Sequence, residues 1–165
     1  KRTEELAEKN NTTVDAKKIR ERKTQIYNYK INSTFIPPRE GVLDVLEYAH
    51  KNNIKIGFVT STTADNIDAV FKTLNNQIKK NHFDFIGNNT LIKEAKPAPD
   101  IYIEALNSLE LKSSECIAIE DTVESALSAH RANIKCVAFP GLFHIDDDFS
   151  FCVKKLDKLN TSIFN

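Results

Sequence analysis

The sequence contains no methionine or tryptophan, and only 4 glycines, 5 prolines and 3 cysteines in 165 residues. So few glycines leave no room for a glycine-rich phosphate-binding loop, and the cysteines and histidines form no zinc-binding pattern. No apolar run approaches the ~18 residues of a membrane-spanning helix, and the first residues do not resemble a signal peptide. Because the chain begins at Lys1 and has no methionine, we expect further sequence upstream.

The charges of the whole chain balance, which does not suggest a strongly basic or acidic protein. There are 23 basic and 23 acidic residues, so we expect neither a nucleic-acid partner nor a membrane partner. The three cysteines cannot all pair with one another, and Cys116 and Cys136 fall in predicted buried strands, so we interpret them as core thiols. We therefore predict a monomeric cytoplasmic protein, with a length sufficient for about one domain.

The stretch 116–122 combines a short apolar run with two adjacent carboxylates, Glu120 and Asp121. The run has the length of a buried strand, and Thr122 is a candidate N-cap for a helix that follows. Adjacent carboxylates repel each other unless a positive charge lies beside them, and Mg²⁺ prefers such oxygen ligands. The alternative is that Glu120 only ends the strand and Asp121 only favours the helix N-terminus.

Together with the stretch 116–122, three further segments show an alternation of strand and helix. Strands are predicted at 54–59, 83–86, 116–120 and 136–139. Helices are predicted to follow Pro38 and Thr63, to begin near Pro99 and to follow Thr122. This order predicts an α/β fold with a Rossmann-like parallel sheet covered by helices on both faces. Because parallel strands end at the same edge, the residues beyond them are expected to converge.

Residues 1–34 are predicted to be helical without strands and carry nine basic against five acidic residues. Thr12 and Asp15 resemble a capping signal for the second helix. Lys23 interrupts the apolar stripe of this helix, which includes Ile19 and Tyr27. Such a lysine either extends its ammonium to solvent or reaches an anionic ligand in a cleft.

Polar groups follow the predicted strands at three places: Thr60 with Ser61, Lys96, and Glu120 with Asp121. A hydroxyl and a backbone N–H at a helix entrance can bind phosphate, and a lysine adds a positive charge. Taken singly, Thr60 could be only a strand-end hydroxyl and Lys96 only an exposed loop residue. Together these groups favour phosphoryl chemistry with Mg²⁺, although no histidine lies at a triad spacing from a hydroxyl.

Three motifs resemble those of the haloacid dehalogenase-like hydrolases. They are Phe58-Val59-Thr60-Ser61-Thr62, Ala95-Lys96-Pro97-Ala98-Pro99-Asp100 and Ile117-Ala118-Ile119-Glu120-Asp121-Thr122. They are similar to the second, third and fourth family motifs, above all in the subgroup of beta-phosphoglucomutase and phosphoglycolate-phosphatase-like enzymes with a helical cap.

The resemblance implies a role for each site residue. Thr60 and the backbone N–H of Ser61 would bind the transferring phosphoryl group, and Lys96 would bridge the nucleophile and the phosphate. Glu120 and Asp121 would bind Mg²⁺ directly or through water. Lys23 would face the substrate from the cap.

The first family motif, a strand that ends in Asp-x-Asp, has no counterpart here. Asp146–Asp148 is an acidic run without a preceding strand, and we predict that it is solvated. The nucleophile is therefore expected upstream of Lys1, with 1–34 as part of a helical cap domain and 35–165 as a core that lacks its first strand. We expect this fragment alone to be inactive.

The resulting hypothesis is a Mg²⁺-dependent phosphatase that hydrolyses small phosphorylated metabolites through an aspartyl-phosphate. A sugar phosphomutase of the beta-phosphoglucomutase type and a non-catalytic binding protein on the same fold are the alternatives. A phospho-receiver signalling domain is disfavoured, since its acidic pair precedes its lysine in the chain and here Lys96 precedes Glu120.

Overall fold

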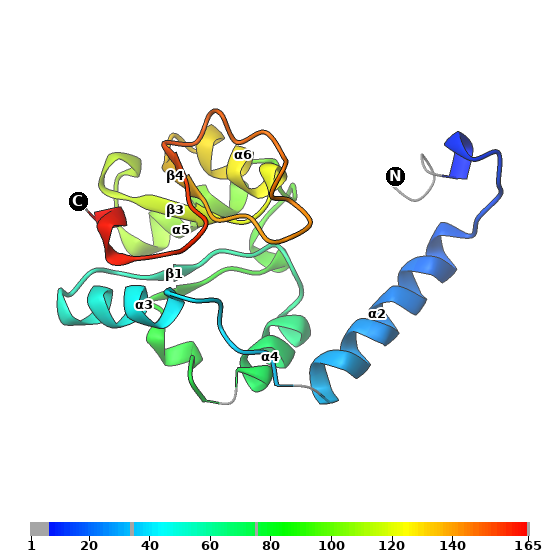
Figure 1. The fold of residues 1–165 in the computed structure, drawn as a ribbon, viewed down its shortest axis with the longest axis horizontal. Helices are drawn as coiled ribbons and strands as arrows, with labels where there is room; N and C mark the ends of the chain where they lie inside the picture. The colour runs from blue at the N-terminus through cyan, green and yellow to red at the C-terminus, as the bar shows by residue number, and fades with distance from the viewer. Residues whose placement is uncertain (1–6, 34, 75, 165) are drawn as a thin grey trace.

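The computed structural model describes residues 7–33, 35–74 and 76–164 (Figure 1). The helices are α2 (Ala16–Ser33), α3 (Val42–Lys51), α4 (Ala64–Thr73), α5 (Asp100–Leu109) and α6 (Val123–Arg131). The strands are β1 (Gly57–Phe58), β2 (Phe85–Ile86), β3 (Ile117–Glu120), β4 (Lys135–Ala138) and β5 (Lys154–Lys155). A 3₁₀ helix, η4 (Thr161–Phe164), follows β5. The predicted alternation of strands and helices is confirmed.

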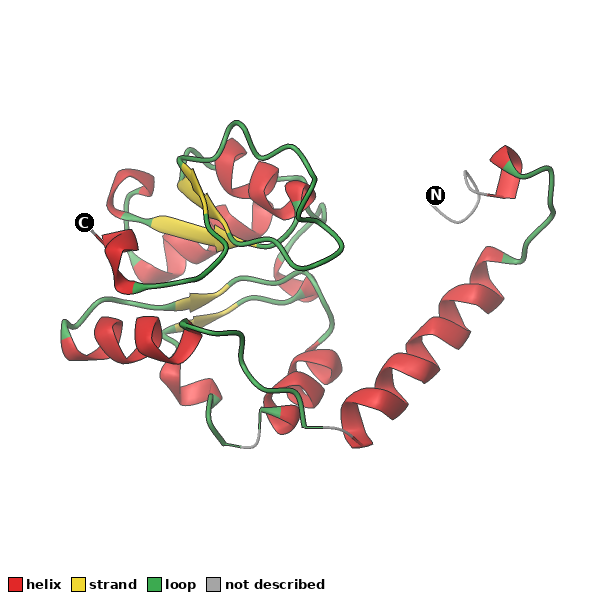
Figure 2. Cartoon of the chain, in the orientation of Figure 1, coloured by secondary structure: helices red, strands yellow, loops and turns green. Residues whose placement is uncertain are grey.

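The described strands form two parallel sheets instead of one. β1 pairs with β2, and the second sheet has the order β3-β4-β5 (Figure 2). β1 is also shorter than the predicted strand 54–59. Among the described strands it pairs only with β2, and regular strand geometry extends only where neighbouring strands provide hydrogen bonds. The α/β class and the parallel pairing are confirmed, and the division into two sheets is new.

Helices cover both faces of the second sheet. On one face, Ile101 and Tyr102 of α5 and Ala126 and Ala129 of α6 pack against Ala118 and neighbouring residues of β3 and β4. On the other face, Val45 of α3 packs with Val137 and Ile163 in a separate cluster. α5 also buries Ala105 and Leu109 against Phe85 of β2. α5 therefore packs against both sheets.

Local capping signals set the ends of the helices. Thr122 begins α6, since its hydroxyl accepts a hydrogen bond from the Ser125 N–H at 3.3 Å. Asn53 and Asn133 adopt left-handed φ angles of 53° and 59° after α3 and α6, as expected of Asn at a helix stop. The prediction that Thr12 caps α2 was wrong. The Asp15 carboxylate is the cap, since it accepts from the Lys18 N–H, the third of the helix.

α2 extends away from the α/β part of the chain and contacts α4 (Figure 1). Ile19 and Ile26 of its predicted apolar stripe are 42% and 43% exposed. Among the described helices, none has the length and apolar character needed to cross a bilayer. The assignment of 1–34 to a partial cap and 35–165 to a core remains a prediction.

Candidate active site

Lys96 joins the ends of the two sheets. Its ammonium donates to the Val59 carbonyl at 3.1 Å, directly after β1. It also pairs with the Glu120 carboxylate at 2.5 Å, at the last residue of β3. Both side chains of this ion pair are only 10% exposed. The carboxyl ends of β1 and β3 therefore meet at one edge, as the sequence predicts.

Tyr102 of α5 completes the buried pair. Its hydroxyl donates to the same Glu120 oxygen that Lys96 contacts, and the Lys96 ammonium lies 5.1 Å from the centre of its ring. Burial, followed by the charge of Glu120, raises the pKa of Tyr102 well above its ordinary value. The phenol therefore stays protonated and remains a hydrogen-bond donor to the carboxylate.

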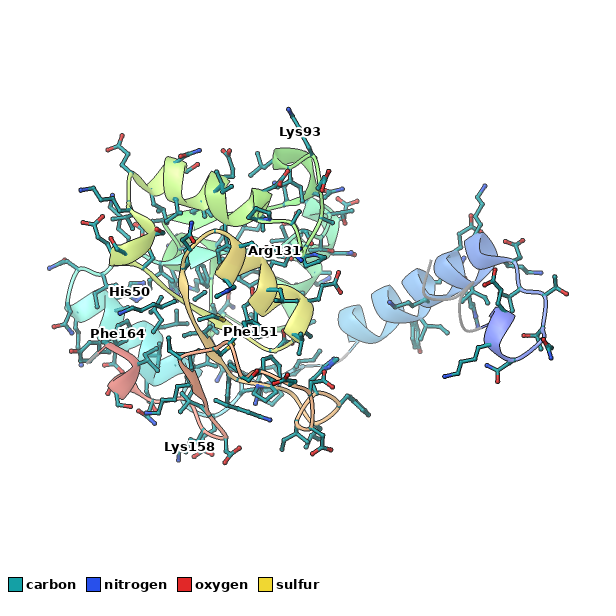
Figure 3. The ribbon with its side chains drawn as sticks, turned by 90° about the horizontal axis from the view of Figure 1, so that it is seen from above. His50, Lys93, Arg131, Phe151, Lys158 and Phe164 are labelled. Atoms are coloured by element: carbon teal, nitrogen blue, oxygen red, sulfur yellow. The ribbon has the colours of Figure 1, made fainter. Side chains whose placement is uncertain are left out.

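The loop that carries Lys96 is held by α6. The fully buried Ser128 hydroxyl donates to the Ala98 carbonyl at 2.6 Å. The Arg131 guanidinium donates to the Pro97 carbonyl at 2.9 Å, and Figure 3 shows Arg131 on this helix. The Lys96–Pro97 peptide bond is cis. These contacts fix the backbone on the carboxyl side of Lys96 and so orient its side chain toward Glu120.

Thr60 and Ser61 lie between the end of β1 and the start of α4, and both are half-buried. The Thr60 hydroxyl accepts from the Thr62 N–H at 3.3 Å, and Thr63 caps α4 by accepting from the Asn66 N–H. The loop thus leads into a helix N-terminus, where backbone N–H groups favour an anion. Thr60 immediately follows the carbonyl that Lys96 contacts, so the two predicted phosphate-binding groups are neighbours.

Asp121 follows Glu120 and is exposed at the same edge. No hydrogen bond or ion pair from a described residue reaches its carboxylate, whereas Glu120 is held by Lys96 and Tyr102. The described residues contain no group of three or more His, Cys, Asp or Glu side chains that could hold a metal ion. Mg²⁺ commonly takes only one or two carboxylates together with water and phosphate oxygens, so Asp121 and Glu120 fit part of such a site.

The structure leaves Lys23 apart from this cluster. Its side chain is exposed on α2. Among the described elements, α2 packs mainly against α4, which carries neither Lys96 nor Glu120. The described residues show no contact between Lys23 and the other predicted site residues. Its role as a substrate-facing residue remains a prediction.

Two groups at the site were not identified from the sequence. Tyr102 is one of several apolar or aromatic residues on the buried face of α5, and its spacing is that of an ordinary core position. The Val59 carbonyl is a backbone group, which no residue pattern distinguishes. The acidic run was predicted correctly: Asp146, Asp147 and Asp148 are exposed.

The α/β fold, with parallel strands that end at one polar edge, narrows the class of protein, and comparison with known proteins identifies the family. The family model described as haloacid dehalogenase-like hydrolase matches residues 1–139. The chain therefore belongs to the haloacid dehalogenase-like hydrolases, which confirms the resemblance inferred from its motifs.

Particular relatives agree with this assignment. Protein CbbY of Rhodobacter capsulatus is 31% identical over 128 residues, which are 78% of this chain and 56% of that protein. A crystal structure of mutant CbbY from Rhodobacter sphaeroides with xylulose-1,5-bisphosphate has a TM-score of 0.78 at 25% identity, covering 89% of this chain and 65% of that one. The beta-phosphoglucomutase structure from Clostridium difficile has a TM-score of 0.70 at 23% identity, covering 96% and 69%, and shows the shared fold. The chain thus spans little more than half the length of the curated CbbY relative.

Proposed function

We propose that this chain is the larger part of a Mg²⁺-dependent phosphatase that acts on small phosphorylated metabolites. The observation that carries the proposal is the Lys96 ammonium, which bridges the Val59 carbonyl and the Glu120 carboxylate. Asp121 lies beside it and has no hydrogen bond or ion pair from the residues that the structure describes. A buried cation next to a free carboxylate and a helix N-terminus provides charges of both signs at one point. This combination suits a phosphate group together with its metal ion.

Each residue has a proposed part in binding and charge stabilisation. The Thr60 hydroxyl and the Ser61 N–H bind phosphoryl oxygens, and the Lys96 ammonium stabilises the negative charge on the transferring group and on its nucleophile. Asp121 holds Mg²⁺, with Glu120 behind it positioning Lys96. When bound, Mg²⁺ neutralises charge on the phosphoryl oxygens. The proposed reaction requires an attacking carboxylate from an Asp-x-Asp motif at the end of a strand, and these 165 residues contain no such strand-end motif.

Phosphorylated sugars are the proposed class of substrate. The support is the crystal structure of the related CbbY with xylulose-1,5-bisphosphate. The three thiols of Cys116, Cys136 and Cys152 are all free, which supports a reducing compartment such as the cytoplasm.

The test is phosphate release by the full-length protein. Xylulose-1,5-bisphosphate, glucose 1-phosphate and phosphoglycolate are assayed with Mg²⁺. We expect Lys96→Ala to lower kcat by about 10²–10³-fold, the usual effect of losing one group that stabilises transition-state charge. Lys93→Ala is the matched control, since Lys93 is an exposed lysine that precedes Lys96 on the same loop (Figure 3). Near wild-type turnover in Lys96→Ala would remove Lys96 from the mechanism.

A second variant tests the metal assignment. Asp121→Asn keeps the size of the side chain and removes its charge, so the Mg²⁺ concentration for half-maximal activity is expected to rise at least about tenfold. Asp146→Asn, at an exposed acid in the loop before β5, should leave this concentration unchanged. An identical Mg²⁺ titration in Asp121→Asn and wild type would exclude Asp121 as a ligand.

A further inference from the structure

We propose that Tyr102 is a positioning residue of the candidate active site and acts through Glu120. Its hydroxyl and the Lys96 ammonium together hold one carboxylate oxygen of Glu120, Oε1, and thereby leave the other oxygen, Oε2, accessible at the polar edge. One carboxylate can then position Lys96 and also assist Asp121 in binding a divalent cation. The inference deepens the proposed function and rests on the magnesium site proposed above.

The two carboxylate oxygens of Glu120 have different surroundings. Oε1 accepts from the Lys96 ammonium at 2.5 Å and also from the Tyr102 hydroxyl. No donor from the described part of the chain reaches Oε2, although every buried side-chain nitrogen or oxygen there has a hydrogen-bond partner. Oε2 is therefore accessible, and it contributes to the 10% exposure of this side chain. The carboxylate presents one oxygen to its two donors and the other to the outside.

The position of the Tyr102 hydroxyl is fixed by packing. Tyr102 lies in the first turn of α5 and is only 5% exposed. Its side chain belongs to the buried cluster that includes Ala118 of β3 and Cys136 of β4. A tyrosine has only two side-chain torsions, and close packing in a core holds both of them. The hydroxyl therefore donates from one point, whereas the flexible stem of Lys96 would by itself let the ammonium follow either oxygen of Glu120.

Lys96 and Tyr102 are held on one braced segment. The Asp100 carboxylate accepts from the Lys93 and Glu94 N–H groups at 3.2 and 3.0 Å, which ties the preceding loop to the start of α5. The Lys96 ammonium lies 5.1 Å from the centre of the Tyr102 ring, so the two side chains also support each other. Both donors therefore reach Oε1 from a common support, and the tyrosine decides which oxygen they share.

The alternative is that Tyr102 is only a core residue whose hydroxyl has found an acceptor, as buried tyrosine hydroxyls usually do. In that case, loss of the hydroxyl would affect the protein in the same way whatever side chain stands at position 120. A positioning role makes a different prediction. The effect of the hydroxyl on cation binding should disappear once the Glu120 carboxylate is itself replaced, because there is then no oriented oxygen to lose.

The test measures Mg²⁺ binding to the full-length protein by titration calorimetry, without a phosphoester. Tyr102→Phe keeps the packed ring and removes only the hydroxyl. We expect the Kd for Mg²⁺ to rise about tenfold or more, the usual effect of losing a group that orients a metal ligand. Tyr48→Phe is the matched control and should leave the Kd unchanged, since Tyr48 stacks on Phe164 at 5.0 Å, beside α3 in Figure 3.

Two further measurements show whether Tyr102 acts through Glu120. In a protein that already carries Glu120→Gln, adding Tyr102→Phe should change the Kd by less than about twofold, because two changes that act on one carboxylate are not additive. A tyrosine with a merely structural role would instead give the same loss in both backgrounds. Replacing Tyr102 by para-aminophenylalanine, which restores a neutral donor at the same place on the ring, should recover most of the affinity that Tyr102→Phe loses.

The outcomes separate this inference from the proposed function. Equal Kd values in wild type and Tyr102→Phe, or equal losses in the two backgrounds, would overturn the positioning role. If Asp121→Asn still weakened Mg²⁺ binding, those same results would leave the proposed phosphatase intact. A wild-type protein that binds no Mg²⁺ would overturn the metal assignment and this inference together. Circular dichroism before each titration establishes that a change in Kd does not come from loss of the fold.

Discussion

Replacing Lys96 by methionine should strongly destabilise the fold, because it leaves Glu120 buried without its cation. The change keeps most of the apolar length of the side chain and removes only the ammonium. In the native chain that ammonium pairs with the Glu120 carboxylate at 2.5 Å and donates to the Val59 carbonyl at 3.1 Å. Both partners of the ion pair are only 10% exposed, so solvent cannot fully replace what is lost.

The expected loss follows from this burial. Removal of one partner from a buried ion pair typically costs about 3–5 kcal/mol. The Tyr102 hydroxyl still donates to Glu120, which places the expected value near the lower end, at about 3 kcal/mol. A loss of this size in a domain of 150–250 residues lowers Tm by about 6–12 °C. The double variant Lys96→Met with Glu120→Gln should recover about 2 kcal/mol, since it removes the uncompensated charge.

Urea denaturation followed by circular dichroism measures both quantities. Lys51→Met is the matched control: Lys51 pairs with Glu47 at 2.7 Å, but the two side chains are 72% and 65% exposed. Loss of this exposed pair should leave the free energy of unfolding almost unchanged, because solvent screens exposed ion pairs. If Lys96→Met were no more destabilising than Lys51→Met, the buried Lys96–Glu120 pair would not hold the two sheets together.

Three further changes test the supports of the site by the same denaturation measurement. Thr122→Ala should cost about 1 kcal/mol by removing the N-cap of α6, and recovery by Thr122→Ser would identify the hydroxyl as the cause. Ser128→Ala should cost about 1–3 kcal/mol, because the Ala98 carbonyl loses its buried donor; a neutral result would show that this contact does not hold the Lys96 loop. Arg39→Lys should cost about 1 kcal/mol. The guanidinium donates to two successive carbonyls after β4 and lies 3.4 Å from the centre of the Phe139 ring, a geometry that lysine cannot reproduce. Unchanged stability would show that these contacts do not stabilise the fold.

Features with local causes could be predicted from the sequence. The cap of α6 depends on a hydroxyl three residues before the N–H that it accepts from, and the stops at Asn53 and Asn133 depend on a residue type that tolerates positive φ. The convergence of Lys96 and Glu120 is longer in range, but it follows from the rule that parallel strands end at one edge. For such features, residue type and order are sufficient.

The features that were missed depend on tertiary contacts. Tyr102 contacts Glu120 because α5 packs across β3, and its position in the helix pattern is that of any core aromatic. The short β1 depends on which neighbours its edges find, since a run of the same composition becomes a longer strand when both edges are paired. The prediction that Thr12 caps α2 was wrong. Thr12 and Asp15 lie within one helical turn of each other, and residue type alone does not show that the helix begins after Asp15.

A structural and a catalytic role for Lys96 do not compete. An ammonium has three N–H donors, and two of them are used by the Val59 carbonyl and the Glu120 carboxylate. Among the described residues, no further hydrogen bond to Lys96 occupies the third. The two structural bonds hold the charge at the edge where β1 and β3 end, and they leave one donor for an anionic group. A lysine held in this way needs no reorganisation when a phosphate arrives, which is the condition under which a fixed charge contributes most to catalysis.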